Sequence, residues 1–183
     1  LVNERNKLPE YFKTHNDLTK TGFEKTIQLL TEFSKEQKQD LKRIFDGRTK
    51  SWKSLDYVAG WFMKAGDYGT YTNAASAFVS TNSICQGQQV PILWPLVFET
   101  GHEIFFAHTS FKWANLANHN AGVTVVVVGI TSRAGKVRYL FSNVDNDVSV
   151  KETSNINAYL VAGPSVLVQK KSLPPDERNA VDA

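Results

Sequence analysis

The nine residues Val123–Thr131 constrain the fold of this chain more than any other segment. They are nearly all β-branched, and polar residues do not alternate with apolar ones along the run. This pattern is typical of a β-strand whose two faces are both buried. We therefore expect an internal strand of a sheet, paired antiparallel with a strand over residues 103–109 through the loop 111–120.

Helical periodicity predicts two helices ahead of the sheet. Ser34 and Gln37 form a capping box, apolar residues then keep to one helical face, and Gly47 stops the helix. A second helix is expected to begin near Ser54 and to end at Gly66, because apolar residues keep the helical period between these positions.

Shorter signals fill the rest of the chain. Asn82 or Ser83 caps a short helix that Pro95 bends, and residues 133–136 form the turn of a hairpin into a strand over 137–142. The order of elements predicts an α/β fold, the second half of a sheet that ends in an antiparallel hairpin. The strands predicted besides the valine-rich one cover residues 75–81, 103–109, 137–142 and, as a last candidate, 166–170.

Composition restricts the class of protein. With 183 residues, 42% of them hydrophobic, the chain suits one globular domain. No apolar run is long enough to cross a bilayer and the first residues have no signal-peptide pattern, so we expect a cytoplasmic protein without a membrane partner. Cys85 is the only cysteine, which excludes an internal disulfide and a cysteine-based zinc cluster. The net charge of +3 permits a nucleic-acid partner without requiring one.

Two kinds of catalytic site are not expected. The four histidines include His102, His108 and His119, which have no metal-ligand spacing and no carboxylate pair beside them, so no metal site is predicted. No Gly-x-Ser-x-Gly elbow marks a nucleophilic serine. Polar and aromatic residues instead follow two predicted strands, in the segments 78–90 and 106–115. Because open α/β sheets bind ligands at the carboxyl ends of their strands, we expect the site there.

Several blocks, in one order along the chain, resemble a known family. They include Leu-Asp-Tyr-Val-Ala at 55–59 and Phe-Lys-Trp at 111–113, together with the segments 78–90, 92–96 and 125–129. They resemble the second half of the methyltransferase domain of MmeI-like enzymes, the type IIL restriction-modification proteins of bacteria that methylate adenine in DNA. The resemblance covers roughly residues 34–171. It implies a partial Rossmann-like methyltransferase fold, S-adenosylmethionine as methyl donor of the intact enzyme, and double-stranded DNA as substrate.

The Phe-Lys-Trp block has the most specific functional implication. In the family it matches the motif that lines the target-base pocket, so Phe111 or Trp113 is the candidate ring that stacks on an extruded base. Lys112 is then the candidate contact to a flanking phosphate. We expect the block in a loop after a strand. Spacing alone favours the alternative, in which both rings only pack on the domain, and the resemblance favours the pocket.

Two further candidates come from a strand end and from a second family block. Asn82 is the residue of its turn that we expect to reach the pocket, whereas Ser83 suits a helix cap. Asp56 and Tyr57 occupy the family block that borders the donor site. An acidic residue in a first helical turn is also favoured by the helix dipole, so the sequence leaves both explanations of Asp56 open.

Basic residues gather in two places. Arg133, Lys136 and Arg138 lie on the predicted hairpin, and Lys170 and Lys171 follow the last candidate strand. Exposed lysines and arginines bind DNA phosphates without reading the base sequence. A DNA-backbone surface and an ordinary solvated surface are both open for these residues.

The sequence lacks two blocks that methyl transfer needs. In the family, the donor lies over a glycine-rich turn, and an Asn/Asp-Pro-Pro-Tyr/Phe block just upstream of the helix that begins here at Ser34 accepts hydrogen bonds from the adenine amine. No Gly-x-Gly turn occurs, and the only Pro-Pro, at 174–175, lies at the other end of the chain. We therefore expect a fragment or truncated form of an adenine methyltransferase that is inactive alone. The alternative is a non-enzymatic DNA-binding or assembly module.

The predicted organisation has three parts. Residues 1–33 have no assignment, residues 34–150 form the back half of the methyltransferase-like domain, and residues 151–183 begin a connection towards a target-recognition domain. The partners expected besides DNA are the remainder of the methyltransferase and that recognition domain. The segment 156–164 resembles the family's transition to it, with Ala158 where the family usually has proline.

Overall fold

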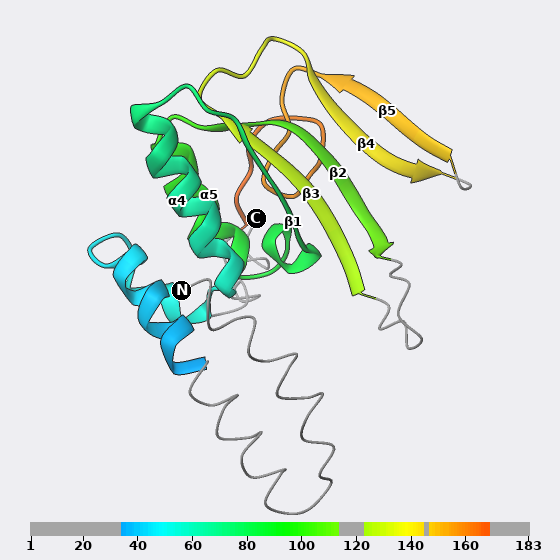
Figure 1. Cartoon of the computed structure of the whole chain (residues 1–183). Coiled ribbons are helices and arrows are strands. Elements are labelled where there is room, and N and C mark those ends of the chain that lie inside the picture. Colours follow the sequence, from blue (N-terminus) through cyan, green and yellow to red (C-terminus); the bar gives the residue numbers. More distant parts are fainter. Residues whose placement is uncertain (1–33, 114–122, 145–146, 169–183) are drawn as a thin grey trace, which may run out of the picture. The chain divides into compact units, whose positions relative to one another are not determined.

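A five-stranded mixed sheet is the main feature of the unit that spans Leu41–Ala183 (Figure 1). The computed structural model describes residues 34–113, 123–144 and 147–168, and the described part of the preceding unit, residues 34–40, is helical. The α/β class is the one that the sequence predicts. The strands are β1 (Ser76–Thr81), β2 (Glu103–Trp113), β3 (Val123–Thr131), β4 (Arg138–Val144) and β5 (Asp147–Thr153); the helices are 34–45, α4 (Tyr57–Tyr71) and α5 (Gln89–Glu99), with the short 3-10 helices η1 (Lys50–Ser54) and η2 (Asn82–Cys85).

β3 is the internal strand that its valines predict. β1 pairs with it antiparallel on one side, and β2 pairs with it antiparallel on the other. Among its nine residues only Val123, the first, is exposed. Since β1 and β2 both oppose β3, they run in the same direction, and β4 runs parallel to β2. The carboxyl ends of β1, β2 and β4 therefore lie at one edge of the sheet.

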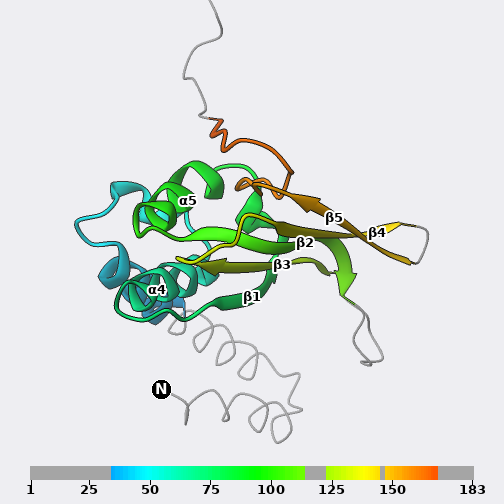
Figure 2. The same ribbon diagram turned by 90° about the horizontal axis from the view of Figure 1, so that it is seen from above.

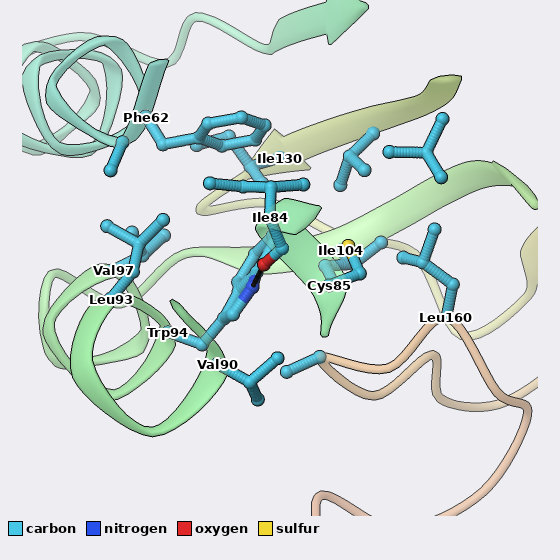
Figure 3. Close-up of a cluster of buried hydrophobic side chains, with 14 of the residues drawn as sticks. Phe62, Ile84, Cys85, Val90, Leu93, Trp94, Val97, Ile104, Ile130 and Leu160 are labelled. Atoms are coloured by element: carbon cyan, nitrogen blue, oxygen red, sulfur yellow. Dashed lines mark hydrogen bonds between the residues drawn. The ribbon is translucent and has the colours of Figure 1, made fainter. Parts of the chain in front are cut away.

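The hydrophobic core joins α4, α5 and η2 to one face of the sheet (Figures 1 and 2). The ring of Phe62 in α4 lies 4.8 Å from that of Phe78 in β1 and 5.6 Å from that of Trp94 in α5. The indole Nε1 of Trp94 donates to the carbonyl of Ile84 at 2.9 Å (Figure 3). This hydrogen bond lets the largest side chain of the core be buried without an unpaired polar atom.

The turn 133–136 does not form the predicted hairpin. Both edges of β3 are already occupied, by β1 and by β2, so the chain after the turn cannot pair with β3. β4 pairs instead with the free edge of β2, in parallel. The antiparallel hairpin that ends the sheet is made by β4 and β5, from Arg138↔Thr153 to Val144↔Asp147. The domain boundary proposed at residue 150 falls inside β5 and stays a prediction.

α4 differs from its predicted limits because its glycines have another role. The helix begins at Tyr57, after η1, and continues through Gly66 to Tyr71. A Cβ atom on Gly66 would lie 3.0 Å from Thr100 Oγ1, and one on Gly69 would lie 2.0 Å from His102 Nε2. Gly66 therefore does not end the helix; both glycines admit side chains from the segment that enters β2.

His102 is the side chain that the glycines admit. It is only 2% exposed, and its Nδ1 lies 2.8 Å from Thr100 Oγ1. The Thr100 hydroxyl itself donates to the Val97 carbonyl at 2.7 Å, so it accepts from His102 Nδ1. His102 Nε2, which faces Gly69, has no hydrogen-bond partner among the described residues. These contacts therefore assign a proton to Nδ1.

Two smaller expectations are also wrong. Neither Asn82 nor Ser83 caps the helix that follows, because both lie in η2 and α5 begins after Gln88. The short helix expected around Pro95 is present as α5, and the bend at Pro95 stays a prediction. Of the last predicted strand, residues 166–168 are not in a strand, and residues 169–170 lie outside the described residues.

The segment 156–164, predicted to lead towards another domain, packs against the core. Asn157 Oδ1 accepts from the backbone N–H groups of Tyr159 at 3.0 Å and Val161 at 3.2 Å, which closes a tight turn. The turn buries apolar side chains: Ile156, Ala158 and Leu160. Small size suits Ala158, which is 1% exposed.

Replacing Gly69 with alanine should destabilise the fold. The added methyl group would overlap the His102 ring, and overpacking of this kind costs about 1–3 kcal/mol, more than the gain of about 1 kcal/mol that alanine brings to a helix interior. Urea unfolding followed by tryptophan fluorescence measures the change. Gly135→Ala is the matched control, because the nearest atom to its new Cβ is 3.8 Å away. The double variant with His102→Ala should recover part of the loss, and a Gly69→Ala chain as stable as the parent would contradict this packing role.

Candidate functional site

The two segments singled out from the sequence meet at the end of the sheet that holds the C-termini of β1, β2 and β4. Val125 of β3 pairs with Thr81, the last residue of β1, on one side and with Phe111 of β2 on the other. Adjacent strands lie ~4.8 Å apart, so these two residues are separated by about 10 Å. They also share one face of the sheet, because directly paired residues point the same way.

The Phe-Lys-Trp block lies in a strand and not in the predicted loop. β2 continues to Trp113, and residues 111–113 pair with Val123, Thr124 and Val125 of β3 after a register shift between His108 and Phe111. The shift has the character of a β-bulge, which lets a strand continue with its side chains turned. Alternation then places Phe111 and Trp113 on one face and Lys112 on the other.

A row of rings leads along β2 to Trp113. The ring of Phe106 lies over Gly129, where a Cβ atom would approach it to within 2.3 Å. His108 and Phe111 follow, with ring centroids 4.7 Å apart, and Trp113 is 6.4 Å from Phe111. Phe111 is half-buried, whereas Trp113 is 46% exposed. Trp113 is thus the ring of the block with a free surface, and Phe111 supports it.

Asp56 and the Asn82 turn are brought together, although 26 positions separate them in the chain. Ser83 Oγ donates to Asp56 Oδ2 at 2.5 Å, and it lies 2.8 Å from Thr81 Oγ1. Ser83 is therefore a link between the end of β1 and the start of α4, not a helix cap. Asp56 is exposed, and Tyr57 and Asn82 beside this link are half-buried.

Gln89 reinforces the same junction and was missed from the sequence. Its side chain is 8% exposed; Oε1 accepts from the Asp56 N–H and Nε2 donates to the Ser54 carbonyl, both at 3.1 Å. The amide thus holds the backbone that enters α4 from 33 to 35 residues away. A polar residue at the start of the apolar run Val90–Leu96 was the available signal, since buried amides are kept where they find partners.

The three described residues predicted to contact the DNA backbone do not all lie on the surface. Arg133 and Lys136 are exposed on the turn after β3. This turn lies at the opposite end of the strands from Val123 and Trp113. Arg138 is buried: its guanidinium binds Glu103 Oε2 at 2.9 Å and Asn155 Oδ1 at 3.0 Å. Because Arg138 is only 7% exposed, its guanidinium has little surface for a phosphate. Lys170 and Lys171 lie outside the described residues.

Other catalytic chemistry finds no basis in the described chain. No three histidine, cysteine or carboxylate side chains within it are grouped to hold a metal ion; His119 lies outside it. Cys85 is buried, and that burial raises the pKa of its thiol to about 12, so the thiol stays protonated at neutral pH. No helix among the described residues is long and apolar enough to span a membrane.

The chain is similar to known proteins in both sequence and structure. The chain is 47% identical to DNA methyltransferase A of Bacillus subtilis (strain 168) over 142 residues, a match that covers 77% of this chain and 16% of that protein. It is also similar to the solved structure of the type IIL restriction-modification enzyme MmeI in complex with DNA, with a TM-score of 0.72 and 38% identity over 76% of this chain and 19% of that one. The chain spans less than a fifth of each relative.

The family match lies on the same part of the fold as the site. The sequence profile of the family described as "MmeI, DNA-methyltransferase domain" matches residues 30–142, which include α4, the Asn82 turn and all of β1, β2 and β3. With more than half of its length matched, the chain belongs to the MmeI DNA-methyltransferase domain family.

Proposed function

We propose that this chain forms the target-base side of an S-adenosylmethionine-dependent methyltransferase that acts on the exocyclic amine of adenine in double-stranded DNA, as part of a restriction-modification system in the cytoplasm. The observation that carries the proposal is the half-exposed ring of Trp113, which lies in the Phe-Lys-Trp block at the carboxyl edge of the sheet. An extruded base needs a flat side chain with a free face, and such stacking is worth roughly 1–3 kcal/mol per base.

Each residue at the edge has a distinct proposed role. Trp113 stacks on the base and Phe111 supports its ring from behind, at 6.4 Å. Asn82 faces the pocket from the end of β1, where its amide offers both a donor and an acceptor. Lys112, exposed on the opposite face of β2, is suited to a phosphate next to the extruded nucleotide and not to the base itself. Arg133 and Lys136 remain proposed phosphate contacts at a distance from the base.

The methyl donor would contact this chain only at Asp56 and Tyr57, where α4 begins. Asp56 presents an exposed carboxylate, of which one oxygen already accepts from Ser83, and the half-buried Tyr57 ring lies next to it. A carboxylate can accept hydrogen bonds from ribose hydroxyls, and a ring can cover an adenine moiety, so both fit a nucleoside-containing donor. S-adenosylmethionine supplies the methyl group on a sulfonium. The glycine-rich turn and the amine acceptors are not in this sequence, so other parts of a longer enzyme would supply them.

The isolated chain should not methylate DNA. It lacks the donor turn and the residues that hold the adenine amine, and base stacking alone does not position a methyl group for transfer. Transfer of a labelled methyl group to mixed-sequence duplex DNA tests this, with full-length DNA methyltransferase A as the positive control. Repeated turnover by the chain alone would contradict the division of roles proposed here.

A chimera separates the enzymatic proposal from a purely structural module. In it, this chain replaces the matching segment of DNA methyltransferase A. If the chain supplies the base-holding edge, the chimera should methylate duplex DNA. A folded chimera that binds the donor and DNA but has no activity would favour the non-enzymatic binding or assembly module.

Trp113→Ala in that chimera should reduce methylation by roughly 5- to 150-fold, the equivalent of one lost stacking contact. Donor affinity should stay nearly unchanged, because the ring belongs to the base edge. Tyr71→Ala is the matched control, since Tyr71 is an aromatic residue 90% exposed at the end of α4. An equal loss of donor affinity, or full activity without the Trp113 ring, would count against the stacking role.

A further inference from the structure

The outer edge of β5 is unpaired in the described chain. β5 is the last strand of the sheet, at the end opposite β1, and its ladder partner there is β4 (Figure 2). Six of its seven residues are exposed, and Val148 and Val150 are 61% and 50% exposed. An edge of this length presents N–H and C=O groups that a further strand can pair with.

We propose that β5 is a self-association edge, and that its partner is β5 of a second copy of this chain, antiparallel and related by a two-fold axis at Ser149. In this register Asp147 faces Lys151 of the other copy, and Val148 faces Val150. Because the interface is symmetric, each of these pairs occurs twice. The strand is thus complementary to itself in both charge and hydrophobicity.

The charges on β5 select this register against others. A two-fold axis at Val150 would set Val148 against Glu152 and Ser149 against Lys151, without an ion pair. A parallel, in-register pair would place equal charges side by side along the strand. Opposite charges directly across a sheet stabilise pairing and equal charges oppose it. Charged residues commonly protect an edge from unrelated strands, and the charge order of β5 matches that of β5 in a second, antiparallel copy.

The backbone geometry permits the same register. In an antiparallel pair, alternate residues of a strand turn their N–H and C=O groups towards one neighbour. A two-fold axis at Ser149 pairs even-numbered residues with even-numbered ones and odd with odd. The residues whose N–H and C=O groups point to the outer edge in one copy therefore meet the same set of residues in the other. The valines of both copies then share one face, next to Phe141, which is the ladder partner of Val150.

Sedimentation equilibrium on the whole chain, over a concentration series, tests the proposal. The parent chain should form dimers that weaken as salt screens the ion pairs. Lys151→Asp places Asp147 opposite an aspartate twice, and it should weaken the dimer by roughly tenfold or more. The charge swap Asp147→Lys/Lys151→Asp restores both pairs with reversed sign and should recover the parent's affinity. Lys64→Asp, the same change at an exposed position on α4, is the matched control and should leave it unaltered.

Three results would overturn the proposal: a parent chain that stays monomeric at every concentration, a Lys151→Asp chain that dimerises as well as the parent, or a charge swap that recovers nothing. Circular dichroism on each variant verifies the fold. If Lys151→Asp fails to fold, Asp147→Lys gives the same test, because it sets two lysines against each other twice.

Discussion

The pairing of β3 on both of its edges is the constraint on which the rest of the structure depends. β3 has β1 on one side and β2 on the other, both antiparallel to it. This arrangement makes β1 and β2 run the same way, although they are not neighbours. It also sends β4 to the far side of β2, because no edge of β3 is left. The meeting of Thr81 and Phe111 on either side of Val125 is a direct result.

Part of this fold follows from local sequence and part does not. The valine-rich strand β3 and the helix over residues 34–45 were predicted correctly, because each depends on a periodic pattern within a few residues. The hairpin at 133–136 was predicted wrongly because its turn residues suit a hairpin, but the choice of partner strand depends on which edges are free. That choice involves residues from Ser76 to Val144, and no local pattern contains it.

The candidate site divides in the same way. The family block at 111–113 was identified, and Trp113 has the free surface that its proposed role needs. The position of this block within β2 was missed, because the strand continues past its predicted end at residue 109 through a register shift. The sequence suggested that Arg138 is an exposed basic residue. In the fold it is buried and pairs with Glu103, which is 35 residues away. Gln89 was missed because a polar residue at the start of an apolar run does not reveal its partners, which are backbone groups distant in sequence.

The glycines of α4 have a consequence for the order of folding. The helix has 15 residues and contains Gly60, Gly66 and Gly69, each of which weakens an isolated helix by about 1 kcal/mol relative to alanine. Such a segment has little tendency to become helical in the unfolded chain. In the fold, Thr100 and His102 occupy the space that Gly66 and Gly69 leave, and Ile44 and Leu41 border Gly60. We therefore expect α4 to form together with the entry to β2, so that Asp56 and Tyr57 at its start reach their positions only when the sheet forms.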